Sequence, residues 1–173
     1  LVEAESTLKD GLAVEPNSTE LRYRLGMLYE KMGRFDESIR EMDEILKQDP
    51  HNPEALNFIG YSWADRGIKL DEAEAMIKKA LSLKPGDGFI TDSLGWVYFK
   101  KNRIEEAIKY LKEATAILPE DAAIAEHLGD AYAKGGKLKD AMEQYQKAQK
   151  LKPDTKGLKE KIDELTARMG IKK

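Results

Sequence analysis

The amino-acid sequence predicts an all-α fold, a right-handed superhelix of the kind in which antiparallel helix pairs stack along one axis. Three features recur once in each period and support this fold class: a proline, a helix-starting residue after it, and a glycine followed by an aromatic residue. Five of the six prolines set the period, at intervals of 34, 35, 34 and 34 residues: Pro16, Pro50, Pro85, Pro119 and Pro153. A chain of this kind presents a long surface rather than one closed pocket.

A helix start follows each of these prolines by two residues. Proline cannot continue a helix, and a short polar side chain at the next helix start accepts hydrogen bonds from free backbone N–H groups. The residues at this place are Ser18, Asn52, Asp87, Asp121 and Thr155. Each pair therefore predicts the end of one helix and the beginning of another.

The opening helix of each unit is predicted to pack closely against a neighbouring helix. Its eighth residue is glycine and its eleventh is aromatic, which gives the pairs Gly26 and Tyr29, Gly60 and Trp63, Gly95 and Tyr98, and Gly129 and Tyr132. Residues three apart share a helix face, and glycine has no side chain to keep another helix away. We expect these residues in the core.

A turn and a second helix complete each unit. The turn residue belongs to a type that tolerates the left-handed conformation at a helix end: Gly33, Gly67, Asn102 or Gly136. Small or apolar residues then recur at i, i+4 and i+7, as in Ala107, Leu111 and Ala114. The second unit has one extra residue before Ala73, so we expect a longer turn there.

The two ends of the sequence differ from the units between them. Ala4, Leu8 and Gly11 fit the three places of a second helix, so we expect the sequence to begin in mid-repeat. An apolar stripe at the other end predicts a capping helix: Leu158, Ile162, Leu165 and Met169. The predicted division is 1–18, the second helix of a truncated repeat; 19–52, 53–87, 88–121 and 122–155, four repeats; and 156–173, a capping helix and tail.

This pattern resembles the tetratricopeptide repeat family. The 34-residue period, the Leu-Gly followed by Tyr, the later Ala and the closing Pro all match that family, most closely in LGWVYFKKNRIEEAIKYLKEATAILP of the third unit. The block DSLGWVYFKKNRIEEAIKYL and the preceding insertion are similar to bacterial repeat proteins, some of which are lipid-anchored scaffolds that deliver substrates to periplasmic proteases. The resemblance implies a non-catalytic protein-interaction scaffold.

The resemblance also implies that the opening helices line a concave groove through their second, fifth, ninth and twelfth residues. The partner-binding groove is then expected at Tyr23, Met27, Asn57, Tyr61, Asp92, Trp96, Phe99, Glu126 and Asp130. Tyrosine and tryptophan supply binding energy at interfaces, and carboxylates favour basic ligands, so we expect an apolar peptide or protein with basic residues. For Trp96, partner contact and ordinary packing are both open; partner contact predicts that Trp96→Ala leaves the melting temperature nearly unchanged.

Other classes of function find little support in the composition. The chain has no cysteine, which excludes disulfides and thiolate metal sites. The spacing of its two histidines, His51 and His127, matches no metal-binding motif. We expect His127 at the surface. We expect no catalytic residue, metal or cofactor. The acidic groove argues against nucleic acid, and no apolar run is long enough for a transmembrane segment.

Two alternative roles remain open from the sequence. One is self-assembly, in which the end of the solenoid near Ala4 and Leu8 stacks on another chain to form a homo-oligomer. The other is a regulatory arm of a larger enzyme. The bacterial cytoplasm and the periplasm are both open as locations. Tethering to the membrane through a region before Leu1 is a further expectation for this chain.

Overall fold

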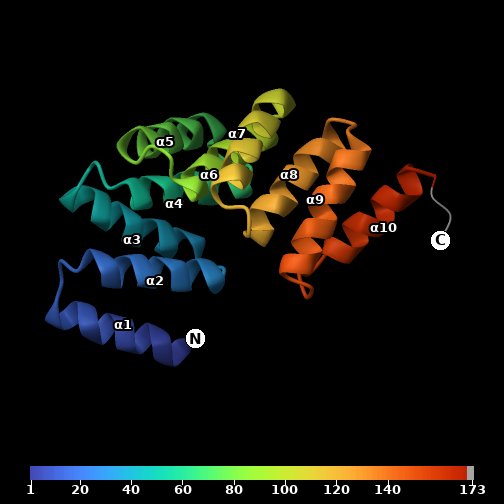
Figure 1. The fold of residues 1–173 in the computed structure, drawn as a ribbon. Coiled ribbons are helices and arrows are strands. Elements are labelled where there is room, and N and C mark those ends of the chain that lie inside the picture. Colours follow the sequence, from blue (N-terminus) through green and yellow to red (C-terminus); the bar gives the residue numbers. More distant parts are fainter. Residues whose placement is uncertain (171–173) are drawn as a thin grey trace.

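The computed structural model describes residues 1–170 of the 173-residue chain, and this part contains ten helices and no strand (Figure 1). The helices are α1 (Val2–Val14), α2 (Thr19–Lys31), α3 (Phe35–Gln48), α4 (Pro53–Asp65), α5 (Leu70–Leu83), α6 (Gly88–Lys100), α7 (Ile104–Ile117), α8 (Ala122–Lys134), α9 (Leu138–Leu151) and α10 (Leu158–Arg168).

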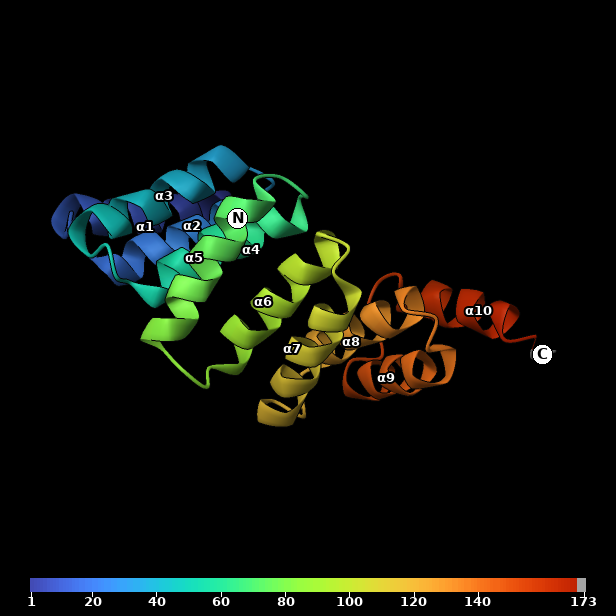
Figure 2. The same cartoon turned by 90° about the horizontal axis from the view of Figure 1, so that it is seen from above.

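The helices stack in chain order into a right-handed superhelix, which confirms the predicted fold class. The closest packing is within the pairs α2 and α3, α4 and α5, α6 and α7, and α8 and α9. Helices α1 and α10 form the two ends of the stack (Figures 1 and 2). One helix pair lies in each range predicted for a complete repeat; the division into repeats itself stays a prediction.

Four of the five predicted helix starts are capped by the expected side chain. The hydroxyl, amide or carboxylate oxygens that accept backbone N–H groups belong to Ser18, Asn52, Asp87 and Asp121. The prediction for Thr155 is wrong, because Gly157 adopts a left-handed conformation with φ of 83° and α10 begins only at Leu158. Thr155 donates its hydroxyl to the Lys152 carbonyl instead.

The glycine in each opening helix lies against the second helix of the same pair, as predicted. A Cβ atom placed on Gly95 would lie 2.6 Å from Cγ of Leu111 and 3.1 Å from the Leu111 backbone nitrogen. The other three glycines make the equivalent approach, Gly26 to Met42, Gly60 to Ile77 and Gly129 to Tyr145. The core therefore runs along the whole stack, between the two helices of every pair.

The turn inside each pair has the expected backbone. The residue predicted for the left-handed conformation has a positive φ in all four pairs, including Asn102 at 60°. The turn between α4 and α5 is one residue longer than the others, and its extra residue, Lys69, is also left-handed with φ of 47°. No helix in the described residues is long and apolar enough to cross a bilayer.

Candidate protein-interaction groove

Seven of the nine predicted groove residues fall into two sets in the structure. The first set makes contacts within the chain on α6 and α8, and we call it the internal network: Asp92, Trp96, Phe99, Glu126 and Asp130. The second set lies on α2 and faces an open pocket: Tyr23 and Met27. Asn57 and Tyr61, on α4, lie in neither set and are half-buried.

Trp96 is a core residue, which favours ordinary packing, one of the two roles that the sequence left open for it. Only 7% of Trp96 is exposed. Its ring stacks between Phe99, at a centroid distance of 4.8 Å, and His127, at 4.2 Å. The indole Nε1 donates to Asp65 Oδ1 at 3.1 Å. The covering histidine comes from α8, the opening helix of the next pair, so contacts between repeats bury this ring.

His127 is partly buried rather than at the surface, and it pairs with a carboxylate across the helices. Its Nδ1 lies 3.0 Å from both carboxylate oxygens of Asp92, and the two side chains are 15% and 9% exposed. Burial alone lowers the pKa of an imidazolium, but the Asp92 charge and hydrogen bond, with Asp130 and Glu126, outweigh it and raise the pKa of His127.

The ion pair between His127 and Asp92 predicts that the free energy of unfolding falls as the pH rises. The folded-state pKa of His127 is above its ordinary value of 6.5, so its contribution is fully present below that value and is lost as the pH rises through the folded pKa. In urea titrations from about pH 6 to about pH 9, we expect the free energy of unfolding to fall. His127→Gln should remove this part of the slope; an unchanged slope in that variant would contradict the assignment.

The carboxylates expected to attract a basic ligand already have a cation from the chain itself. Lys161 of α10 places Nζ 2.7 Å from Glu126 Oε1 and 2.7 Å from Asp130 Oδ2. Tyr145 donates its hydroxyl to Asp130 at 2.7 Å. Burial works against the ammonium, but the two carboxylates raise the pKa of Lys161. Both carboxylates therefore already have a partner within the chain.

The residues on α4 link the internal network to the open pocket. Burial and nearby carboxylates raise the pKa of the Tyr61 hydroxyl, so Tyr61 stays neutral, with its ring 6.4 Å from that of His127. Asn57 has a buried amide oxygen with no hydrogen-bond partner among the described residues. Toward α2, Phe58 meets the ring of Tyr23 edge-on at 5.8 Å.

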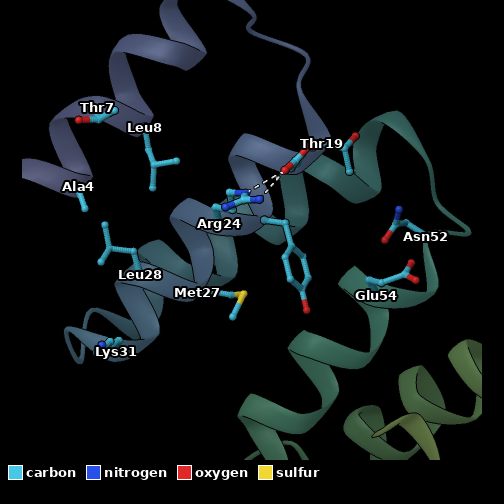
Figure 3. A pocket seen from close by; sticks show the side chains of 12 residues that line it. Ala4, Thr7, Leu8, Thr19, Arg24, Met27, Leu28, Lys31, Asn52 and Glu54 are labelled. Atoms are coloured by element: carbon cyan, nitrogen blue, oxygen red, sulfur yellow. Dashed lines mark hydrogen bonds and ion pairs between the residues drawn. The ribbon is translucent and has the colours of Figure 1, made fainter. Parts of the chain in front are cut away.

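An open pocket of about 1010 Å³ lies between α1, α2 and the start of α4 (Figure 3). Met27, 51% exposed, projects into it, and Leu8 of α1 and Leu28 of α2 point toward one another across it. The residues that line it are Ala4, Thr7, Leu8, Thr19, Glu20, Tyr23, Arg24, Met27, Leu28, Lys31, Asn52 and Glu54. We call this the α1–α2 pocket.

Sequence reasoning missed Arg24 and Leu28 as candidate binding residues. They are the sixth and tenth residues of their opening helix, and the groove was assigned only to the second, fifth, ninth and twelfth. The predicted start in mid-repeat could have indicated this pocket, because it places Ala4 and Leu8 at an exposed end of the stack. The sequence analysis considered those two residues only for self-assembly. Within the described residues, no cluster of ionisable side chains has the composition of a metal site.

Comparisons with known proteins agree with the fold. The Tetratricopeptide repeat family matches the chain twice, at residues 1–60 and 93–155. The TPR repeat-containing protein PA4667 of Pseudomonas aeruginosa is 33% identical over 101 residues, which is 58% of this chain and 17% of that protein. The chain therefore spans about a sixth of that relative's length.

Solved structures show the same architecture. A crystal structure of MamA protein is 27% identical with a TM-score of 0.66, and the match covers 88% of this chain and 83% of that chain. TTC0263, a thermophilic TPR protein from Thermus thermophilus, has a TM-score of 0.81 at 20% identity, covers 94% and 89%, and shows the fold alone. This fold supports a role as a protein–protein interaction scaffold, and proteins of this kind are generally non-catalytic. From its repeat period, its paired helices and these matches, the chain belongs to the tetratricopeptide repeat family, among its bacterial members.

Proposed function

We propose that this chain is a non-catalytic scaffold that binds a segment of a partner protein in the α1–α2 pocket, at the N-terminal end of its concave groove. The observation that supports this proposal is the pocket itself, which has a volume of about 1010 Å³ and contains the half-exposed side chain of Met27. Concave sites with apolar walls and a few polar groups are the usual binding sites of proteins. Tyr23 and Leu28 extend the apolar wall on either side of Met27.

The distribution of paired charges favours this end of the groove over the internal network. Lys161 already pairs with both Glu126 and Asp130, and Trp96 is already covered, so a partner there would have to displace contacts within the chain. Around the pocket the charges are exposed; Arg24 and Glu20, for example, pair at 2.7 Å with 64% and 73% of their side chains exposed. Such surface pairs contribute little, so a partner can replace them at small cost. The predicted partner is apolar at its centre and mixed in charge at its edge.

Selection from a peptide library displayed on phage tests this function and does not require an identified partner. We expect the selected peptides to bind Met27→Glu at least tenfold more weakly than the unaltered chain, because a charge would replace an apolar contact at the centre of the interface. Lys112→Glu, on the exposed face of α7, is the matched control and should bind normally. Selected peptides that bind both variants equally well would contradict the proposal.

A second candidate function is self-assembly, because the same exposed face of α1 can meet another copy. In that case light scattering over a concentration series shows a rising mass, and Leu8→Glu abolishes the rise. A constant monomer mass at the highest concentration excludes it.

A further inference from the structure

The fifth residue of one predicted unit contacts the sixth residue of the next at three junctions between successive opening helices. At the remaining junction, between α4 and α6, both residues are uncharged. The four pairs are Tyr23 and Phe58, Asn57 and Ser93, Asp92 and His127, and Glu126 and Lys161. One of these pairs contains a side chain that titrates near neutral pH, so pH can act selectively on the junction between α6 and α8.

His127 holds this junction through two contacts with α6. Its Nδ1 lies 3.0 Å from both oxygens of Asp92, whose side chain is 9% exposed. Its ring stacks on that of Trp96 at a centroid distance of 4.2 Å and an interplanar angle of 19°. A charged imidazolium strengthens both contacts, because it neutralises the carboxylate and because a cation is attracted to the face of an indole ring.

Within the described residues, His127 is the one cation paired with Asp92. The ionisable groups around the imidazole are Asp92 on α6, Tyr61 on α4, and Glu126 and Asp130 on α8 itself. Lys161 of α10 is bound to the last two of these, and Lys100 of α6 lies over the ring of Trp96 and donates to the Asp65 carbonyl. The charge of Asp92 is therefore compensated only while His127 is protonated.

Loss of the His127 proton leaves the charge of Asp92 uncompensated at a nearly buried position, which is costly. We infer that this pair makes the contact between α6 and α8 a pH-sensitive joint of the superhelix, closed while the imidazole is charged and open when it is neutral. The inference is independent of the proposed function, because it does not involve the α1–α2 pocket.

The packing around the junction fits such a joint. Helices α6 and α8 pack less extensively against each other than α4 and α6 do, whereas α7 packs closely against α8. The contact between α7 and α8 can therefore act as the hinge about which α8, α9 and α10 move relative to α1–α5 (Figures 1 and 2). Opening of the joint would widen the groove between α6 and α8.

The joint closes at low pH and opens at high pH. Burial lowers the pKa of His127, but the charge and hydrogen bond of Asp92, with the charges of Asp130 and Glu126, raise it above its ordinary value of 6.5. The imidazole is charged below the raised pKa and neutral above it. At the next junction Lys161 takes the place of His127, and it stays charged because two carboxylates outweigh burial and raise its pKa.

The distance between two spin labels on the groove side tests the inference. The chain has no cysteine, so labels attach only at Glu54→Cys on α4 and Ala123→Cys on α8, both exposed positions. In electron–electron double resonance, we expect the mean distance to be longer at about pH 9 than at about pH 6, by about 2 Å or more. This comparison uses the chain with its own histidine.

Variants of His127 separate its charge from other effects of pH. His127→Gln should show the longer distance at both pH values, because glutamine is neutral throughout. His127→Lys should show the shorter distance at both, because lysine stays charged as Lys161 does at the next junction. His51→Gln, at the exposed second histidine, is the matched control and should keep the full pH response. Circular dichroism melts establish that each variant is folded.

Two results would overturn the inference. An equal distance at both pH values in the chain with its own histidine would mean that the junction is rigid whatever the charge of His127. The same lengthening in His127→Gln would assign the response to another group. Peptide binding at the α1–α2 pocket is measured separately, so failure of the joint leaves the proposed function standing.

Discussion

Replacing Trp96 by alanine should lower the free energy of unfolding by about 3–5 kcal/mol, the usual cost of truncating a buried aromatic side chain. The ring is 7% exposed, is stacked between Phe99 and His127, and donates its N–H to Asp65. Removal of the ring leaves a cavity between α6 and α8 and a carboxylate without its donor. Urea denaturation followed by circular dichroism measures the loss.

Phe89→Ala is the matched control for Trp96→Ala. Phe89 is on the same helix but 58% exposed, so its truncation should change the free energy of unfolding by less than about 1 kcal/mol. Equal midpoints for Trp96→Ala and the unaltered chain would mean that Trp96 is a surface residue after all. Partner binding at the α1–α2 pocket should be unaffected by either change as long as the chain remains folded.

Gly95→Val should destabilise the chain by about 2–3 kcal/mol, and Gly95→Ala should destabilise it as well. Helix propensity alone predicts the opposite sign for alanine, a gain of about 1 kcal/mol. The new Cβ atom would lie 2.6 Å from Cγ of Leu111, which is fully buried and cannot move aside freely. Thermal and urea unfolding of both variants measures the sign as well as the size.

A double variant separates steric overlap from helix propensity. A Leu111→Ala background, itself destabilised, removes the 2.6 Å overlap with the Leu111 side chain and leaves the 3.1 Å approach to its backbone nitrogen, so the penalty of Gly95→Ala should become smaller. The same penalty in both backgrounds would mean that the Leu111 side chain is not the source of the overlap.

The sequence predicted well those features that depend on residues near one another in the chain. The caps at Ser18, Asn52, Asp87 and Asp121 need only the residues that follow them, and the turn at Asn102 needs only its own backbone. The glycine contacts also lie inside one helix pair. The prediction that Thr155 caps a helix failed because Gly157 is left-handed and α10 begins only after it. The repeat period alone does not predict this local effect.

The environments of Trp96 and His127 depend on contacts between pairs and were not predictable in the same way. The ninth residue of α6, Trp96, is covered by the sixth residue of the next opening helix, His127. His127 covers Trp96, whereas Met27, the equivalent of Trp96 on α2, remains half exposed beside the α1–α2 pocket. The predicted groove residues therefore lie in different environments on α2 and on α6.

Hydrogen–deuterium exchange with and without a peptide selected from the displayed library tests the central claim most directly, since it locates binding along the chain. Because α1 has no buried residue, its amides should exchange fast in the free chain. We predict that the peptide slows exchange in α1 and α2 and leaves α6 and α8 unchanged. Slowed exchange in α6 and α8, with α1 unaffected, would contradict binding in the α1–α2 pocket.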